Sequence, residues 1–287
     1  NEDWTDPKVW KKANPSLGIT VGIDKVRAAC ESARQNPGEE NAFRQLRLNQ
    51  WVKQAVRWMP MDKWDACSFA VDPESLEGRV CYGGLDLSSS TDITAFVLVF
   101  PPEDETDKYS VLPFFWIPED NIDLRVRRDH VMYDLWERQG YLQTTEGNVV
   151  HYGYIEKFIE ELGKQYNIRE IAFDRWGAVQ MVQNLEGMGF TVVPFGQGFK
   201  DMSPPTKELM KLVLEQKIAH GGHPVLRWMM DNIFIRTDPA GNIKADKAKS
   251  TEKIDGAVAT IMALDRAIRC GNENGASVYD DRGILFI

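Results

Sequence analysis

Residues 80–87 read VCYGGLDL, and this stretch divides the chain into two parts of different character. Its apolar residues, its paired glycines and the aspartate near its end are typical of a short buried strand. The 79 residues before it contain few strand candidates, whereas apolar runs that suit strands and helices recur after it. We therefore expect a globular domain to begin at Val80.

Two further strands are expected directly after the first. Residues 93–100 (ITAFVLVF) and 109–117 are apolar runs separated by an acidic loop at 101–108, so the three strands predict an antiparallel meander. The remaining pattern predicts strands at 168–173 and 190–195, a hairpin at 233–244, and helices at 121–138, 152–166, 178–188, 205–218, 225–231 and 250–269. This order indicates an α/β fold, with a mixed sheet and helices on both faces.

The segment before Val80 reads as a helical arm. Residues 22–35 and 40–51 have the spacing of two amphipathic helices, and Asn36-Pro37-Gly38 is expected to end the first. We predict a helical arm or connector at 1–79, an α/β domain at 80–270 and a C-terminal tail at 271–287.

Composition narrows the possible functions. The chain of 287 residues has 43 acidic and 34 basic residues, a formal charge of −9, which argues against a protein whose main task is to coat nucleic acid. No apolar run approaches the roughly 18 residues needed to cross a bilayer, so we expect no membrane partner.

Cysteine and histidine give little evidence of a metal site. The four cysteines lie far apart in sequence, so no CxxC pair is present, and reduced thiols are expected. His220 and His223 form an HGGH group that reads as a turn, with a metal site as the alternative.

Three aspartates lie at positions where the predicted elements would bring their carboxylates close together in space. Asp86 ends the first strand, Asp174 ends the strand IAF, and Asp255 lies in the first turns of the last helix. The carboxyl ends of strands open onto solvent in an α/β sheet, and a helix beside that edge can add a third carboxylate. The alternative for each is a turn or helix-cap role, and Asp92 has the same alternative in the serine-rich loop.

Clustered carboxylates would repel one another unless cations neutralise them. Ligands that are all oxygen favour Mg²⁺ or Mn²⁺, and two such ions about 4 Å apart can activate water and stabilise the leaving oxygen in phosphodiester hydrolysis. The sequence lacks GxxxxGK[ST] and GxSxG motifs, so it gives no support to a phosphate-binding loop or a serine nucleophile.

Several motifs resemble one known family. DLSSSTD after the Gly-Gly strand, IAFD followed by RWG, and KSTEKIDGAVATIMALDRA resemble the nuclease domain of tailed-bacteriophage terminase large subunits. FRQLRLNQWV and the following MDKWDAC resemble the segment that joins the ATPase and nuclease halves in one branch of that family. The strand aspartates alone would be shared with many ribonuclease-H-like enzymes.

The resemblance implies a fold and a site. The fold would be ribonuclease-H-like, with a central five-stranded mixed sheet flanked by helices. Asp86, Asp174 and Asp255 match the catalytic carboxylates that hold the metal ions, expected to be two Mg²⁺ or Mn²⁺. Asp86 would bridge both ions, and Asp92 matches a further acidic position near the first metal.

The resemblance also implies a biological role. The enzyme would cut concatemeric double-stranded viral DNA when packaging starts and ends, in the cytoplasm of the bacterial host, at the capsid portal. Its partners would be the small terminase subunit, the portal protein and an ATPase half that is missing here, so Asn1 is expected to be a fragment boundary.

DNA contacts are expected from basic residues near the acidic site. Basic residues outnumber acidic ones between Gly198 and Lys253, and five of them stand close to the predicted hairpin or to Asp255: Arg236, Lys244, Lys247, Lys249 and Lys253. A solvated lysine-rich loop is the alternative for this segment.

Two other functions remain open at this point. The arm and the apolar end of the tail would also suit a DNA-binding or assembly module of a packaging motor with little nuclease activity of its own. A resolvase-like nuclease that prefers branched DNA is the third hypothesis.

Overall fold

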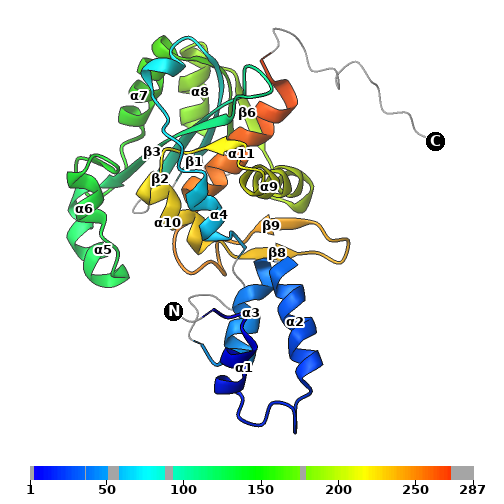
Figure 1. The fold of residues 1–287 in the computed structure, drawn as a ribbon. Coiled ribbons are helices and arrows are strands. Elements are labelled where there is room, and N and C mark those ends of the chain that lie inside the picture. Colours follow the sequence, from blue (N-terminus) through cyan, green and yellow to red (C-terminus); the bar gives the residue numbers. More distant parts are fainter. Residues whose placement is uncertain (1–2, 36, 51–57, 88–92, 175–178, 273–287) are drawn as a thin grey trace.

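A mixed sheet with helices on both faces forms the body of the molecule, and a group of N-terminal helices extends from it (Figure 1). This computed structural model describes residues 3–35, 37–50, 58–87, 93–174 and 179–272. The predicted α/β class is confirmed.

The predicted meander is present in the sheet. It consists of β1 (Val80–Asp86), β2 (Thr94–Phe100) and β3 (Tyr109–Pro118), which pair in antiparallel fashion in chain order. On the other side of β1, β5 (Asn167–Asp174) and then β6 (Val192–Phe195) are added in parallel. β1 therefore lies at the centre, where the antiparallel and parallel halves meet.

The predicted number of five strands is wrong, because the described residues form a sheet of seven strands. The additional strands are β4 (Gln143–Thr145) and β7 (Ile218–Ala219), and both pair with β3 in parallel. Strands of three and two residues are too short to show an alternating pattern, so the sequence gives no sign of them.

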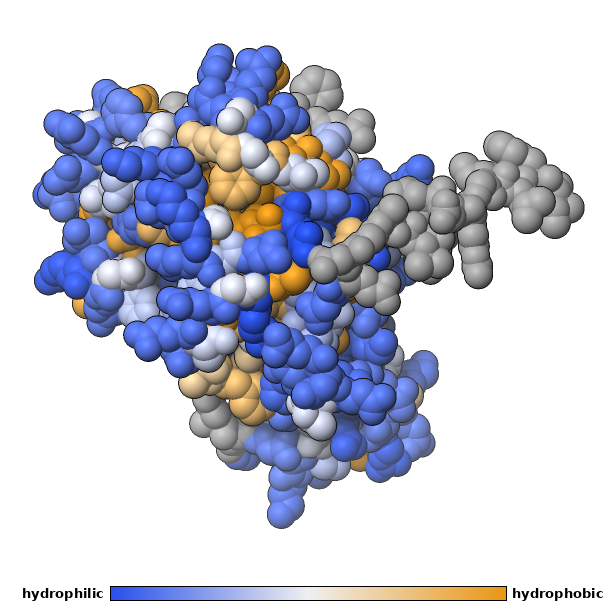
Figure 2. Space-filling model, turned by 90° about the horizontal axis from the view of Figure 1, so that it is seen from above, coloured by the Kyte–Doolittle hydropathy of each residue, from blue (hydrophilic) through white to orange (hydrophobic). Residues whose placement is uncertain are grey.

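Alternation along the strands builds one apolar layer on each face of the sheet. In β2, Ala95, Val97 and Val99 point to one face, and Phe96, Leu98 and Phe100 point to the other. The first layer is covered by α4 (Met61–Ala66), α9 (Phe199–Leu214), α10 (Pro224–Asn232) and α11 (Asp255–Cys270). The second layer is covered by α7 (Tyr152–Gln165) and α8 (Val179–Gly187). Outside these layers the surface seen from above is mostly hydrophilic, with apolar side chains visible mainly in a hollow (Figure 2).

The predicted helix at 121–138 is two helices, α5 (Ile122–Asp129) and α6 (Tyr133–Arg138), after a 3-10 turn, η2 (Glu119–Asn121). His130 ends α5 in the left-handed conformation, with φ 54°. Glycine usually occupies such a position, so the absence of glycine concealed this break in the sequence.

Two other helices begin at residues different from those predicted. α9 begins at Phe199 instead of Pro205 and contains Pro204 and Pro205 in its interior. The last helix begins at Asp255 instead of Ser250, because residues 246–250 form a turn in which the Ser250 hydroxyl donates to the Asp246 carbonyl at 2.8 Å.

The N-terminal helices have a core of their own. They are α1 (Pro7–Ala13), α2 (Ile23–Gln35) and α3 (Pro37–Leu48), so the second predicted helix begins at Pro37. Trp10, Val26, Cys30 and Phe43 are buried among one another, apart from both layers of the body. The predicted hairpin, β8 (Ile235–Thr237) and β9 (Ile243–Ala245), lies between this group and the rest of the molecule in Figure 1.

A short segment before β1 completes the description. It contains a 3-10 turn, η1 (Glu74–Leu76), whose Leu76 packs in the layer beneath α7 and α8. Among the described residues, no helix has the length and apolar character required to cross a bilayer.

Candidate active site

Asp86 is the last residue of the central strand and is almost fully buried, with 2% of its surface exposed. Side chains two residues apart share a face of a sheet, so Asp86 lies on the same face as Gly84 and Tyr82. Tyr82 packs in the layer beneath α11. The Asp86 carboxylate is therefore directed to the side of the sheet that α11 covers.

Gly84 determines how closely α11 approaches this face. A Cβ atom added at Gly84 would overlap the carbonyl oxygen of Ala259, so only glycine permits this contact between strand and helix. At the far end of the helix, the Tyr82 hydroxyl donates to the Gly271 carbonyl at 2.8 Å. α11 thus runs opposite to β1, and its first residue, Asp255, arrives at the carboxyl end of the strand.

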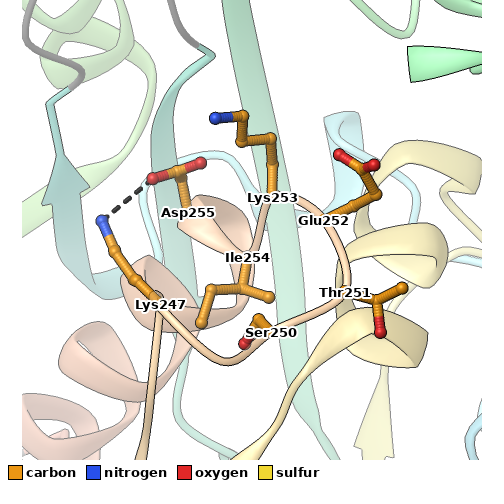
Figure 3. Close-up of a pocket in the computed structure, with 7 residues that line it drawn as sticks. All are labelled: Lys247, Ser250, Thr251, Glu252, Lys253, Ile254 and Asp255. Atoms are coloured by element: carbon orange, nitrogen blue, oxygen red, sulfur yellow. Dashed lines mark hydrogen bonds and ion pairs between the residues drawn. The ribbon is translucent and has the colours of Figure 1, made fainter. Parts of the chain in front are cut away.

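Lys247 lies between the two carboxylates. Its Nζ is 2.6 Å from Asp86 Oδ2 and 2.9 Å from Asp255 Oδ1. The Asp86 and Asp255 side chains are 3% and 11% exposed, whereas that of Lys247 is 48% exposed. The contact between Lys247 and Asp255 is drawn in Figure 3. One cation at this position therefore touches both buried carboxylates.

Asp174 ends β5, the strand next to β1. Leu85 pairs with Phe173, so Asp86 and Asp174 follow at the same edge of the sheet. The negative charge of Asp174 contributes to raising the pKa of Asp86. Within the part of the chain that is described, no three His, Cys, Asp or Glu side chains converge closely enough to form a complete metal cage. The predicted metal residue Asp92 lies outside the described residues, as does the segment after Asp174.

The electrostatics of the site reflect burial and crowding of negative charge. Burial raises the pKa of Asp86 to about 7; the Lys247 ammonium opposes this effect, and the carboxylates of Asp255 and Asp174 add to it. Burial disfavours the charged form of Lys247, but the carboxylates of Asp86 and Asp255 outweigh it and raise the pKa of this lysine. One ammonium therefore only partly offsets the carboxylates that surround it.

The donor set suits a hard divalent cation. Asp86 Oδ2 is buried and lies 2.6 Å from the Lys247 ammonium, which also donates a hydrogen bond to Asp255 Oδ1. Burying a carboxylate is costly unless a cation pairs with it, and here two buried carboxylates share one ammonium. Asp86 and Asp255, with Asp174 beside them, offer the oxygen ligands that Mg²⁺ and Mn²⁺ prefer.

A pocket of about 340 Å³ adjoins Asp255 on the side of the loop that precedes α11. Its lining consists of Lys247, Ser250, Thr251, Glu252, Lys253, Ile254 and Asp255 (Figure 3). Two lysines and two hydroxyls line it beside Asp255, and side chains of these types contact phosphate groups in nucleic-acid complexes.

The remaining predicted DNA-binding residues lie near this pocket or on the hairpin. Lys244 on β9 donates to the Gln197 carbonyl at 3.1 Å, and Lys249 lies 5.6 Å from the Phe234 ring centre. Lys253 lines the pocket, and Arg236 is exposed on β8. Their role in DNA binding stays a prediction.

The prediction of a turn at HGGH is confirmed. Gly221 and Gly222 have φ values of 64° and 67°, a conformation that favours glycine. His220 Nε2 donates to the Trp64 carbonyl at 2.7 Å and its ring stacks on Trp64 at 4.1 Å, while His223 caps α10. Both histidines therefore have structural roles.

Sequence reasoning missed the contact between Lys247 and the carboxylates. It assigned this lysine to DNA only, together with its neighbours in the same loop. Lys247 is eight residues before Asp255 and follows no helical or strand spacing, so its side chain is placed by the tertiary fold alone.

Comparison with known proteins identifies relatives over nearly the whole chain. Residues 1–270 match the family model described as terminase large subunit, endonuclease domain. The terminase large subunit of Enterobacteria phage HK97 is 36% identical over 274 residues, which cover 95% of this chain and 53% of that protein. Protein YmfN of Escherichia coli strain K12 is 30% identical over 285 residues, 96% of this chain and 63% of that protein.

The fold agrees with these sequence relationships. The crystal structure of the HK97 bacteriophage large terminase matches with a TM-score of 0.68 and 36% identity, covering 93% of this chain and 55% of that one. The chain thus spans about half the length of the HK97 protein. The match supports the predicted ribonuclease-H-like class, in which a meander is extended by parallel strands.

Proposed function

The chain belongs to the family of terminase large subunit endonuclease domains, and from this premise we propose that it is a metal-dependent endonuclease that cuts double-stranded DNA. The observation that carries the proposal is that two buried carboxylates, Asp86 and Asp255, both contact the Lys247 ammonium at the end of the central strand. A cation-binding pair at that edge suits phosphodiester chemistry.

In this proposal Asp86, Asp174 and Asp255 would hold the metal ions, and Asp92, which lies outside the described residues, would add a further carboxylate. Bound Mg²⁺ or Mn²⁺ would supply a water nucleophile and would stabilise the leaving oxygen. The chain's own contribution is rigid placement: β1 and β5 fix two of the carboxylates, and the close contact between Gly84 and α11 fixes the third.

Basic residues would hold the DNA beside these carboxylates. Lys249 and Lys253 lie in the loop that leads to Asp255, and Arg236 and Lys244 lie on the neighbouring hairpin. Contacts of this kind go to the phosphate backbone, so they would position a duplex without selecting a sequence.

Membership of the family is the basis for a proposed biological role. We propose that the enzyme cuts concatemeric viral DNA at the start and end of packaging, in the bacterial cytoplasm at the capsid portal. The portal protein, the small terminase subunit and an ATPase half of the same large subunit are the proposed partners.

Cleavage of plasmid DNA with and without Mn²⁺ or Mg²⁺ tests the proposal. We expect metal-dependent cutting that falls at least about a hundredfold in Asp86→Asn, because a buried ligand to the catalytic metals is lost. Asp24→Asn is the control, since that side chain is 89% exposed on the arm. Undiminished cutting by Asp86→Asn would exclude this site.

The second candidate function is a DNA-binding or assembly module. It is favoured by the arm, which has its own core and exposes Ile19 and Leu46 at 88% and 77%. DNA binding without metal-dependent cleavage, in the same assay, would support this function over the nuclease. A preference for four-way junctions over linear duplex would instead support a resolvase.

A further inference from the structure

We infer that Lys247 is a built-in counter-cation of the active site, which holds the Asp86 and Asp255 carboxylates together and is displaced when a divalent cation binds. This inference rests on the proposed function, because it concerns the same carboxylates. It assigns Lys247 a positioning role in addition to the predicted contact with DNA.

The Lys247 ammonium lies between the two carboxylates. Its nitrogen lies within 3 Å of an oxygen from each carboxylate, the position where a shared metal ion would have to lie. Two cations cannot occupy this position together, since like charges at such distances repel strongly. Metal binding therefore requires Lys247 to move.

One ammonium does not fully neutralise the two carboxylates that it contacts. Lys247 carries one positive charge but faces two carboxylates, since its Nζ donates a hydrogen bond to Asp255 Oδ1 and lies 2.6 Å from Asp86 Oδ2. The Asp86 and Asp255 side chains are only 3% and 11% exposed, so water screens little of the negative charge that the single ammonium leaves uncompensated. A cation of higher charge would satisfy the site better, so displacement of the lysine is favourable.

The Lys247 side chain can move away from the carboxylates without unfolding of its loop. Half of it is exposed, and it borders the pocket beside Asp255. The backbone around it is held, because Asp246 N donates to the Phe234 carbonyl at 2.9 Å and Thr251 N to the Asn232 carbonyl at 3.3 Å. Rotation of one flexible side chain is sufficient.

The Asp86 and Asp255 carboxylates therefore stay close together before a metal ion binds. Without a cation, the two carboxylates would repel one another and loosen the start of α11 against the end of β1. Lys247 maintains their separation and supplies the competitor that the metal has to displace. Metal affinity is then set partly by this lysine.

Calorimetric titration of the full chain with Mn²⁺ at pH 8 tests the inference. We expect Lys247→Met to bind Mn²⁺ roughly tenfold more tightly than the unmodified chain, because the competing charge is gone. Lys249→Met is the matched control from the same loop; its ammonium lies near Phe234, and we expect its affinity to be unchanged. Unchanged or weaker Mn²⁺ binding by Lys247→Met would overturn the inference.

A crystal of the unmodified chain soaked in Mn²⁺ gives a second test, which does not depend on the folding of any variant. We expect Lys247 Nζ to lie beyond hydrogen-bonding distance of Asp86 when Mn²⁺ is bound between the carboxylates. A lysine that keeps both contacts beside the bound ion would contradict displacement.

These readouts separate the inference from the proposed function. If metal displaces Lys247 but plasmid stays intact, the nuclease proposal fails and the counter-cation role holds. If plasmid is cut in a metal-dependent manner while Lys247→Met leaves Mn²⁺ affinity unchanged, only the counter-cation role fails.

Discussion

At the scale of single residues, His223 shows how a buried side chain can link stability to pH. Its Nδ1 accepts a hydrogen bond from Leu226 N at 3.5 Å, and its ring packs against Phe115 and Tyr141. Burial, and then the charge of His220, lower the pKa of His223 to about 4. The folded state therefore requires the neutral ring, which can accept the bond that caps α10.

The direction of the pH effect follows from this lowered pKa. The unfolded chain takes up a proton near pH 6.5, but the folded chain takes it up only near pH 4, so stability is complete above pH 6.5 and is lost as the pH falls toward 4. We expect the free energy of unfolding to fall by roughly 2 kcal/mol between pH 7.5 and 5 because of this group. Urea unfolding at the two pH values measures it.

The matched variant is His223→Asn, which retains a capping group but does not titrate in this range. We expect its unfolding free energy to fall less over the same interval. The remainder comes from other groups, including His220, whose pKa is also lowered by burial. An equal fall in both proteins would show that His223 does not contribute.

At the scale of secondary-structure elements, the contact of α11 with β1 determines the geometry of the site. Gly84→Ala would place a methyl group against the carbonyl oxygen of Ala259, which belongs to the helix backbone and cannot rotate away. We expect a loss of about 1–3 kcal/mol in unfolding free energy from this overpacking. Because the helix must shift, Asp255 would move relative to Asp86, and cleavage should fall at least tenfold.

The control for this change is Gly153→Ala on α7. A Cβ there meets nothing within 4 Å, so alanine should be neutral or stabilising by up to about 1 kcal/mol. Denaturant unfolding and the plasmid assay would be applied to both variants. Wild-type stability and cleavage in Gly84→Ala would mean that α11 tolerates displacement.

Much of the sheet could be predicted from the sequence because its central strands are long and apolar. Residues 93–100 are buried on both faces of the sheet and read as a continuous apolar run, and β2 covers all but the first of them. The break at His130 and the short strands β4 and β7 depend on tertiary contacts, which override local preference. Local pattern therefore gives the order of long elements but not the edges of the sheet.

Some residues of the candidate site could be predicted from the sequence, and one could not. Asp86 and Asp174 could be placed from the sequence, since both end strands that are recognisable by their apolar character. Lys247 could not, because its side chain reaches the carboxylates from an irregular loop. The position of a charge on a loop is set by the elements that anchor the loop, here β9 and α11.

At the scale of the whole molecule, the separate cores of the arm and of the body indicate where the arm ends. The predicted limit at residue 79 stays a prediction, but Trp58, Met59, Met61, Trp64 and Cys67 are buried in the layer that covers the sheet. This segment is also tied to the C-terminal half, since Arg227 forms an ion pair with Asp65 at 2.6 Å. The packing therefore favours a limit before Trp58.

Two truncated chains distinguish these limits. A chain of residues 58–287 keeps both layers of the body and loses only the separate core of α1–α3, so we expect one cooperative urea transition with a smaller m-value than the full chain.

A chain of residues 80–287 also loses Trp64, which is fully buried and stacks on His220. Removing one large buried aromatic side chain costs about 3–5 kcal/mol, and total stability is typically only about 5–15 kcal/mol. Because several buried side chains are lost together, we expect the shorter chain to unfold or aggregate at 25 °C, as judged by near-UV circular dichroism and gel filtration. A cooperative transition in residues 80–287 at the urea midpoint of residues 58–287 would instead place the limit of the arm at residue 79.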